Sequence, residues 1–189
     1  MLAWDWPVFP ILLLFWMENV VVGVLNVARM LLLDPGDLGT WAGKLFFVPF
    51  FCVHYGMFTL VHGVFVMALF GGPGYERAGD SLFSADPVFR AIREYNLWLP
   101  VAAIAGSHLF SFCWNYCLRG EYLRALLQDL MTRPYARVVV LHLTIIFGGF
   151  GAMALGSPLW ALVLLVVLKI GIDLAAHIRE RNKMAGAEG

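Results

Sequence analysis

The chain has 189 residues, of which 13 are basic, 13 are acidic and 61% are apolar. Charged residues make up 14% of the chain, against about 25% in a typical water-soluble domain. This composition excludes a soluble enzyme, a nucleic-acid-binding protein and a secreted disulfide scaffold. It predicts an all-α protein that crosses a lipid bilayer several times.

Long apolar segments follow one another along the chain, at residues 8–33, 45–70, 98–118, 138–155 and 158–178. Each meets or approaches the ~17 to 25 residues that a helix needs to cross the hydrocarbon layer. Glycine and proline, the strongest helix breakers, punctuate the intervening loops. We therefore expect a polytopic transmembrane helix bundle that forms one domain over residues 1–183, followed by a mobile polar tail at 184–189.

Two segments between these spans are helical in pattern but too short to cross a bilayer. In Asp86–Tyr95, Asp86 can cap a helix and Pro87 suits the first helical turn. In Glu121–Met131, leucines recur at helical spacing opposite polar residues. Such amphipathic helices lie in the headgroup plane or pack on the protein's own cytoplasmic face, and the sequence leaves both arrangements open.

Basic residues near span ends predict the orientation, because Lys and Arg accumulate on the cytoplasmic side. An outside N-terminus places the following basic residues in the cytoplasm: Lys44, Arg119, Arg124, Arg133, Arg137, Arg179, Arg181 and Lys183. The outward segments then carry Arg77, Arg90 and Arg93. We expect a multi-pass protein of the bacterial cytoplasmic (inner) membrane, with the N-terminus outside and the C-terminus in the cytoplasm.

Polar and ionisable side chains occur inside every expected span, where such groups usually face the bundle interior and have a function. In chain order they are Glu18, Asn19, Asn26, Arg29, His54, Tyr55, His62, His108, Ser111, Asn115, His142, Lys169, Asp173 and His177. Lys169 and Asp173 are four residues apart, so an ion pair between them is expected. Together these residues predict a histidine-rich polar column through the bundle.

Two histidines and a carboxylate at one depth can bind zinc or non-haem iron. Depths counted at about 1.5 Å per residue predict two ligand sets, namely Glu18, His62 and His108, and His54, His142 and Asp173. In this hypothesis the residues that orient the ligands are Asn19, Tyr55, Ser111 and Asn115. A haem held by His54 and either His108 or His142 is the less favoured cofactor.

Two further classes of function would use the same polar column without a metal: transport and structural assembly. Lys169, Asp173 and His177, with Asn26 and Arg29, can form an ion pair or a proton relay in a transport component. Five spans without an inverted repeat favour a homo-oligomer or a larger membrane complex over a stand-alone transporter. In the structural class, the protein is an assembly subunit whose helices approach closely at small residues: Gly23, Gly106, Gly148 and Gly151. Whether the protein is an enzyme stays open, and the lipid bilayer is the expected partner.

The segments Phe15–Gly23 (FWMENVVVG) and His54–Gly63 (HYGMFTLVHG) resemble those of a family of small bacterial integral membrane proteins known as a domain of unknown function. The resemblance covers chiefly the first two expected spans. It implies a polytopic inner-membrane protein and carries no activity with it.

Overall fold

The computed structural model describes residues 8–34, 36–72, 74–75, 84–155, 159–160, 162–171 and 174. The regular structure in these residues is entirely helical, which confirms the all-α bundle. The elements are α1 (Val8–Leu32), α2 (Leu38–Phe70), α3 (Asp86–Glu94), α4 (Trp98–Ser111), the π-helix η1 (Phe112–Leu118), the 3₁₀ helix η2 (Glu121–Leu123), α5 (Leu127–Thr132) and α6 (Tyr135–Leu155). A further apolar helix covers Leu162–Gly171.

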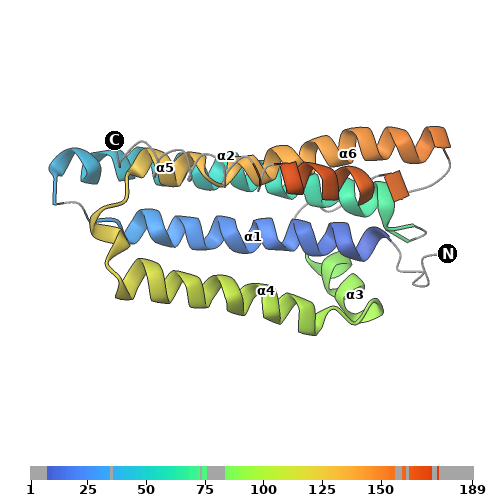
Figure 1. Ribbon diagram of the computed structural model, residues 1–189, viewed down its shortest axis with the longest axis horizontal. Coiled ribbons are helices and arrows are strands. Elements are labelled where there is room, and N and C mark those ends of the chain that lie inside the picture. The colour runs from blue at the N-terminus through green and yellow to red at the C-terminus, as the bar shows by residue number, and fades with distance from the viewer. Residues whose placement is uncertain are drawn as a thin grey trace.

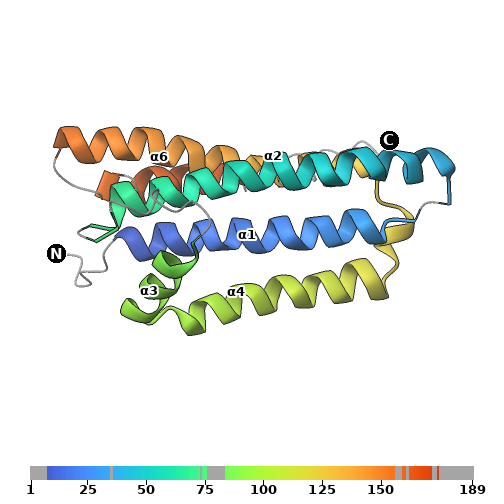
Figure 2. The ribbon, with the colours of Figure 1, turned by 180° about the vertical axis from the view of Figure 1, so that it is seen from behind.

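The long helices run side by side along the long axis of the molecule, with α1 at the centre (Figure 1). Helix α4 lies on one side of α1, and α2 and α6 lie on the other, an order that is also seen from behind (Figure 2). Helix α1 contacts α2, α4, α5 and α6. Polar side chains on α1 can therefore meet residues of α2, α4 and α6.

Three helical segments of the described residues are long and apolar enough to cross a membrane: Val8–Leu32, Leu38–Phe70 and Leu127–Gly149. A fourth candidate is the pair Asp86–Glu94 and Trp98–Leu118, which is bent by 112°. The fifth expected span, 158–178, is described only in part, as the helix Leu162–Gly171 and its flanks. The first four expected spans thus overlap described helices, although their ends differ, and a fifth crossing stays a prediction.

Helix α2 begins seven residues before the expected start at residue 45, because Asp37 caps it. The Asp37 carboxylate accepts a bond of 2.6 Å from the Thr40 hydroxyl and one of 2.8 Å from the Thr40 backbone N–H. These hydrogen bonds lower the pKa of Asp37. Lys44, which the sequence places just before the second expected span, is therefore inside the second turn of a capped helix.

Lys44 joins α2 to the end of α1. Its side chain is buried, and its ammonium group donates to the carbonyl oxygens of Leu31 and Leu33, the former at 3.0 Å. The same group lies 3.9 Å from the centre of the Trp41 ring. A cation at the carbonyl end of a helix satisfies backbone acceptors that have no partner within the helix. Lys44 therefore fixes the angle at which the chain turns from α1 into α2.

We expect Lys44→Met to lower the free energy of unfolding by about 1.5 to 3 kcal/mol, the usual worth of hydrogen bonds to a charged group. The measurement is thermal or chemical unfolding of the detergent-purified protein. Arg93→Met, at an exposed position on α3, is the control and should change stability by less than about 0.5 kcal/mol. Equal stability of Lys44→Met and the parent protein would show that the carbonyl contacts do not hold this turn.

The expected amphipathic helix over Glu121–Met131 is not continuous. It forms η2, then an extended residue at Leu126, then α5. Contacts with the end of α1 interrupt the helix. The Tyr122 carbonyl accepts a hydrogen bond of 3.0 Å from the Asp34 backbone N–H, and Leu130 is buried against α1. The second half of this segment therefore packs on the protein itself, and with α6 it extends the fourth span toward the N-terminus. Leu123 and Leu126 are exposed, so an interfacial arrangement of the first half stays a prediction.

The other short helix, α3, forms where it was expected but is not capped by Asp86. Ala85 is the N-cap residue and makes no side-chain cap bond, so Asp86 lies inside the first turn. The helix is held instead by Tyr75, whose hydroxyl donates to the Glu94 carboxylate at 2.7 Å, and by the Arg90 guanidinium, 4.4 Å from the Tyr75 ring centre. Burial raises the pKa of Tyr75 to about 12, so its hydroxyl remains a donor at neutral pH.

Candidate functional site

An ion-pair network joins three helices at the middle of the bundle. The Glu18 carboxylate of α1 lies 2.5 Å from Nη1 of Arg137 on α6 and 3.1 Å from Nε2 of His108 on α4. Its side chain is 16% exposed and that of Arg137 is 36% exposed. At 2.5 Å, the Arg137 guanidinium and the Glu18 carboxylate form a direct ion pair. Glu18 thus has two cationic or polar neighbours, and Arg137 retains N–H groups for another acceptor.

A polar cavity of about 220 Å³ lies next to this network, between α1, α4 and the start of α6. The residues that give it its polarity are Asn26, Arg29, His108, Arg133 and Arg137. Three guanidinium groups therefore line one small space. Like charges brought together in this way repel one another unless an anion lies between them.

Arg29 has no carboxylate partner among the described residues. Its guanidinium carbon lies 5.8 Å from the centre of the Phe112 ring and 5.9 Å from that of the Tyr116 ring. The Tyr116 hydroxyl donates to the Arg29 backbone carbonyl at 2.6 Å, which fixes η1 against α1. Aromatic rings hold an arginine by its face and leave its N–H groups at the edge free to bind an acceptor.

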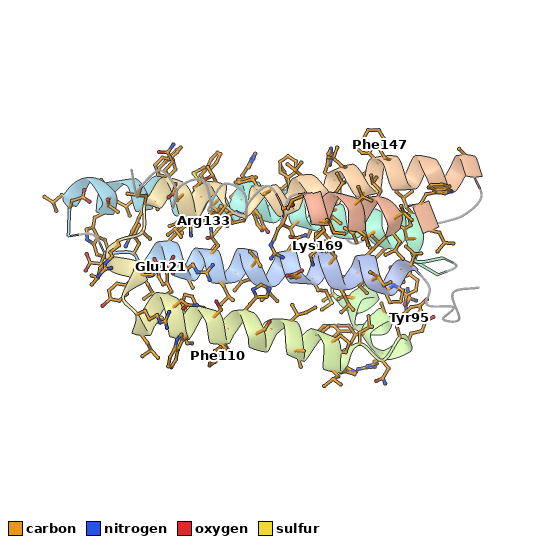
Figure 3. The ribbon with its side chains drawn as sticks, in the orientation of Figure 1. Tyr95, Phe110, Glu121, Arg133, Phe147 and Lys169 are labelled. Carbon is orange, nitrogen blue, oxygen red and sulfur yellow. The ribbon has the colours of Figure 1, made fainter. Side chains whose placement is uncertain are left out.

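Arg133 lines the cavity from the turn between α5 and α6. It forms a 3.7 Å contact with Glu121, and both side chains are well exposed. Figure 3 shows these two residues at the same end of the bundle. Exposed pairs at this distance contribute little, so Glu121 does not immobilise the Arg133 guanidinium.

Asn26 connects the cavity to α5. Its side-chain amide donates to the Leu130 carbonyl at 2.7 Å, and Asn26 itself is buried. Buried amides are normally hydrogen-bonded because an unpaired one is costly. The bond therefore fixes the turn that carries Arg133.

A second polar pair joins α2 to α6. Nε2 of His62 lies 2.9 Å from Nδ1 of His142, and Nδ1 of His62 lies 2.5 Å from the Phe58 carbonyl. His62 is 3% exposed, whereas His142 is exposed. These imidazoles make hydrogen bonds to each other, and neither is bonded to Glu18 or His108.

The remaining histidine of α2, His54, belongs to an aromatic stack. Its ring centre lies 5.2 Å from that of Phe50 and 5.8 Å from that of Tyr135. The neighbouring Tyr55 hydroxyl donates to the Asn19 backbone carbonyl at 2.9 Å. The Asn19 side chain is buried, and neither its oxygen nor its nitrogen has a hydrogen-bond partner. These residues lie outside the arginine-lined cavity.

The other expected site residues fall into two groups. The Asn115 amide donates to the Ser111 hydroxyl at 3.2 Å, a contact within the helix formed by α4 and η1. The Lys169 ammonium lies 5.7 Å from the centre of the Phe15 ring, whereas Asp173 and His177 lie outside the described residues. The expected Lys169–Asp173 pair therefore stays a prediction.

Neither expected ligand set comes together in the part of the chain that is described. Glu18 contacts His108 but not His62, and His62 contacts His142. No group of three His, Cys, Asp or Glu side chains positioned for a metal occurs in the described residues. The binding of zinc, iron or haem stays a prediction. A complete ligand set would need residues outside the described ones, such as Asp173.

Arg133 and Arg137 were not predicted as site residues. The sequence pattern indicated them only as cytoplasmic charges that set the orientation of the chain in the membrane. Both fall within 127–149, which the structure makes one apolar candidate span. Their spacing of four residues places them on one helix face, and that spacing was the available indication. It was overlooked because the fourth span was expected to begin at Val138.

Comparison with known proteins places the chain in a family without an assigned role. The family model described as a family of unknown function (DUF6498) matches residues 1–188, so the chain belongs to that family. This confirms the resemblance to an uncharacterised family. No curated protein and no solved structure matches the chain.

Proposed function

We propose that this member of a family of unknown function is a multi-pass membrane protein that binds a small anion in its arginine-lined cavity. The ligand carries a phosphate or carboxylate group. The observation that supports the proposal is the placement of Arg29, Arg133 and Arg137 around one cavity. Guanidinium groups match the geometry of phosphate and carboxylate oxygens and bind them through paired N–H donors.

The charge balance around the cavity favours an anion. Glu18 contacts Arg137, and Glu121 contacts Arg133 only weakly, while Arg29 has aromatic neighbours and no carboxylate among the described residues. Three positive charges thus face at most two negative ones. In a site of reduced dielectric constant, the excess positive charge attracts an anion more strongly than it would in water.

The size of the cavity restricts the ligand. Its volume of about 220 Å³ is below the ~300 to 1,000 Å³ typical of pockets that enclose whole organic ligands. It suits a single anionic group, either free in solution or at the end of a larger molecule. A free phosphate and the phosphate of a lipid headgroup are the two sources of this chemistry.

The expected orientation of the chain in the membrane is consistent with both sources of the anion, free phosphate and a lipid headgroup. Arg29 is in the last turn of α1, and the Lys44 ammonium bonds the carbonyl groups at the end of that helix. The C-cap residues of η1, η2 and α5 are Arg119, Arg124 and Arg133. The end of α1 and these short elements lie at the same end of the bundle, on the left in Figure 1. Arg90 and Arg93 belong to α3 at the opposite end. Because basic residues accumulate on the cytoplasmic side, we propose that the cavity opens toward the cytoplasm of a bacterial cell and that the N-terminus is outside.

Glu18 would compete with the ligand for Arg137. In the structure, the carboxylate contacts Nη1 of Arg137, a residue that lines the cavity. An anion that takes this guanidinium leaves Glu18 with His108 as its polar neighbour. Binding is therefore expected to be weaker than three arginines alone would give, and to depend on the charge of Glu18.

We expect Arg29→Gln to weaken binding of inorganic phosphate by about tenfold, the effect of losing roughly 1.4 kcal/mol from a charge-assisted contact. Glu18→Gln should strengthen it, because the competing charge is removed. The measurement is isothermal titration of detergent-purified protein with phosphate, and with acetate as the carboxylate probe. Opposite directions for two substitutions in one helix cannot both arise from general damage to the fold.

Arg119→Gln is the control, because Arg119 lies 6.0 Å from the Trp114 ring and does not line the cavity. Titration in nanodiscs of neutral lipid and of phosphatidylglycerol separates the two sources: occupation by lipid headgroups would abolish phosphate binding only in the anionic lipid. Unchanged phosphate affinity in both Arg29→Gln and Glu18→Gln would contradict the proposal.

A further inference from the structure

The hydrogen bonds of the histidine pair on α2 and α6 assign a tautomer to each ring. Nδ1 of His62 lies 2.5 Å from the Phe58 carbonyl, which can only accept, so Nδ1 carries the proton. In a neutral ring, Nε2 of His62 is then an acceptor, so the donor in the 2.9 Å contact is Nδ1 of His142. Nε2 of His142 is left with a lone pair and with no hydrogen-bond partner in the described part of the chain.

His142, which carries this lone pair, belongs to the lining of an apolar groove between α2 and α6. The groove has a volume of about 360 Å³, and its walls include Phe58, Val61, Phe65, Leu69, Ile145 and Ile146. Most of these side chains are exposed on the outer surface of the bundle. In the proposed membrane orientation they face hydrocarbon, so the histidine pair is the polar feature of an otherwise apolar groove.

Lipid chains cannot satisfy the free nitrogen. Nε2 of His142 is an acceptor, and hydrocarbon and ester groups carry no N–H or O–H donor. An unpaired acceptor away from water costs free energy, so a membrane-soluble molecule with a hydroxyl group would gain a bond that the surrounding lipid cannot provide. The two phenylalanine walls, Phe58 and Phe65, favour an aromatic ring on that molecule.

We propose that the groove between α2 and α6 binds a membrane-soluble aromatic alcohol, a phenol or hydroquinone with an alkyl chain, whose hydroxyl donates to Nε2 of His142. The Phe58 carbonyl and His62 hold His142 in the accepting tautomer, so they are positioning groups. The apolar walls contact the ring and the chain. This site is independent of the arginine-lined cavity and shares none of its lining residues.

The experiment compares two probes that differ in one hydrogen-bond donor. Protein labelled with nitrogen-15 at histidine is placed in nanodiscs and titrated with para-decylphenol and with its methyl ether, para-decylanisole. The phenol should shift the Nε2 resonance of His142 and bind roughly three- to tenfold more tightly than the ether, as one hydrogen bond predicts. Equal affinities, or a His142 resonance that neither probe shifts, would overturn the proposal.

Variants separate the hydrogen bond from the groove. His142→Phe should abolish the difference between phenol and ether, whereas His142→Gln, which keeps an acceptor oxygen, should retain part of it. His54→Phe, at an imidazole of α2 outside the groove, is the matched control and should bind both probes as the parent does. In Gly149→Leu, the new side chain projects into the groove beside Leu69, so the binding of both probes should weaken equally. If His142→Phe still binds the phenol more tightly than the ether, the phenol hydroxyl is bonded elsewhere and the proposal is wrong.

Discussion

Arg137→Leu is expected to lower the free energy of unfolding by about 3 kcal/mol, because it leaves the half-buried Glu18 carboxylate without its closest cation. Removal of one member of a buried ion pair typically costs ~3 to 5 kcal/mol, and the partial exposure of the Arg137 side chain favours the lower value. His108 contacts the same carboxylate and limits the loss further. The measurement is equilibrium unfolding in detergent.

The double variant Glu18→Leu/Arg137→Leu supplies the decisive comparison. Replacement of both charges by apolar groups removes the unpaired carboxylate, so the double variant should be more stable than Arg137→Leu alone. Arg133→Leu is the matched control, since its pair with Glu121 is exposed and should contribute at most about 1 kcal/mol. A double variant whose loss equals the sum of both single losses would show that Glu18 and Arg137 do not interact energetically.

Residues of one helix were easier to predict from the sequence than their partners. Helical periodicity predicts one polar face of α1 that carries Glu18, Asn19, Asn26 and Arg29. In the structure, Asn26 and Arg29 line the cavity and Glu18 contacts Arg137 beside it. The Asn19 side chain is buried outside the cavity and has no hydrogen-bond partner. Periodicity specifies a face but not the helix that covers it. That Glu18 meets Arg137 instead of His62 depends on how far α6 is shifted along α1, and the sequence pattern does not contain this shift.

The depth estimate has a related limit. It counted residues inward from the outer end of each expected span, and for α2 that end, Phe70, lies where the sequence places it. Depth along a helix does not specify which helices turn their histidines toward one another: Glu18 contacts His108, whereas His62 contacts His142. The basic residues Lys44 and Arg137 were excluded from the spans because charge is costly in lipid, yet both are partnered inside the bundle.

Small residues in the apolar spans were predicted as positions of close approach, with mixed results. A Cβ atom at Gly23 would lie 2.4 Å from a Tyr55 ring carbon, so the expected contact exists there. At Gly106 a Cβ atom would meet nothing within 4 Å. Composition identifies a glycine but not the bulk of its neighbour. A close approach also occurs at Gly63, a position that the sequence pattern did not indicate.

The close packing of α1 on α2 at Gly63 carries the other large expected effect. A Cβ atom at Gly63 would lie 2.6 to 2.8 Å from three atoms of the Trp16 indole, closer than real side chains approach. Trp16 cannot readily move, because its indole N–H donates to the Thr59 carbonyl at 2.7 Å. Gly63→Ala should therefore force the two helices apart or break that bond, at a cost of about 1 to 3 kcal/mol.

Gly56→Ala provides the matched control, because it makes the same substitution in the same helix at a position where a Cβ atom meets nothing within 4 Å. Alanine is the better helix former by about 0.5 to 1 kcal/mol, so this variant should be as stable as the parent or more stable. The two alanine variants should thus change the unfolding midpoint in opposite directions, and the Trp16 fluorescence environment should change only in Gly63→Ala. Equal behaviour of the two variants would mean that α1 and α2 do not pack through Gly63, and that the positions of Glu18 and His62 relative to each other are set by other contacts.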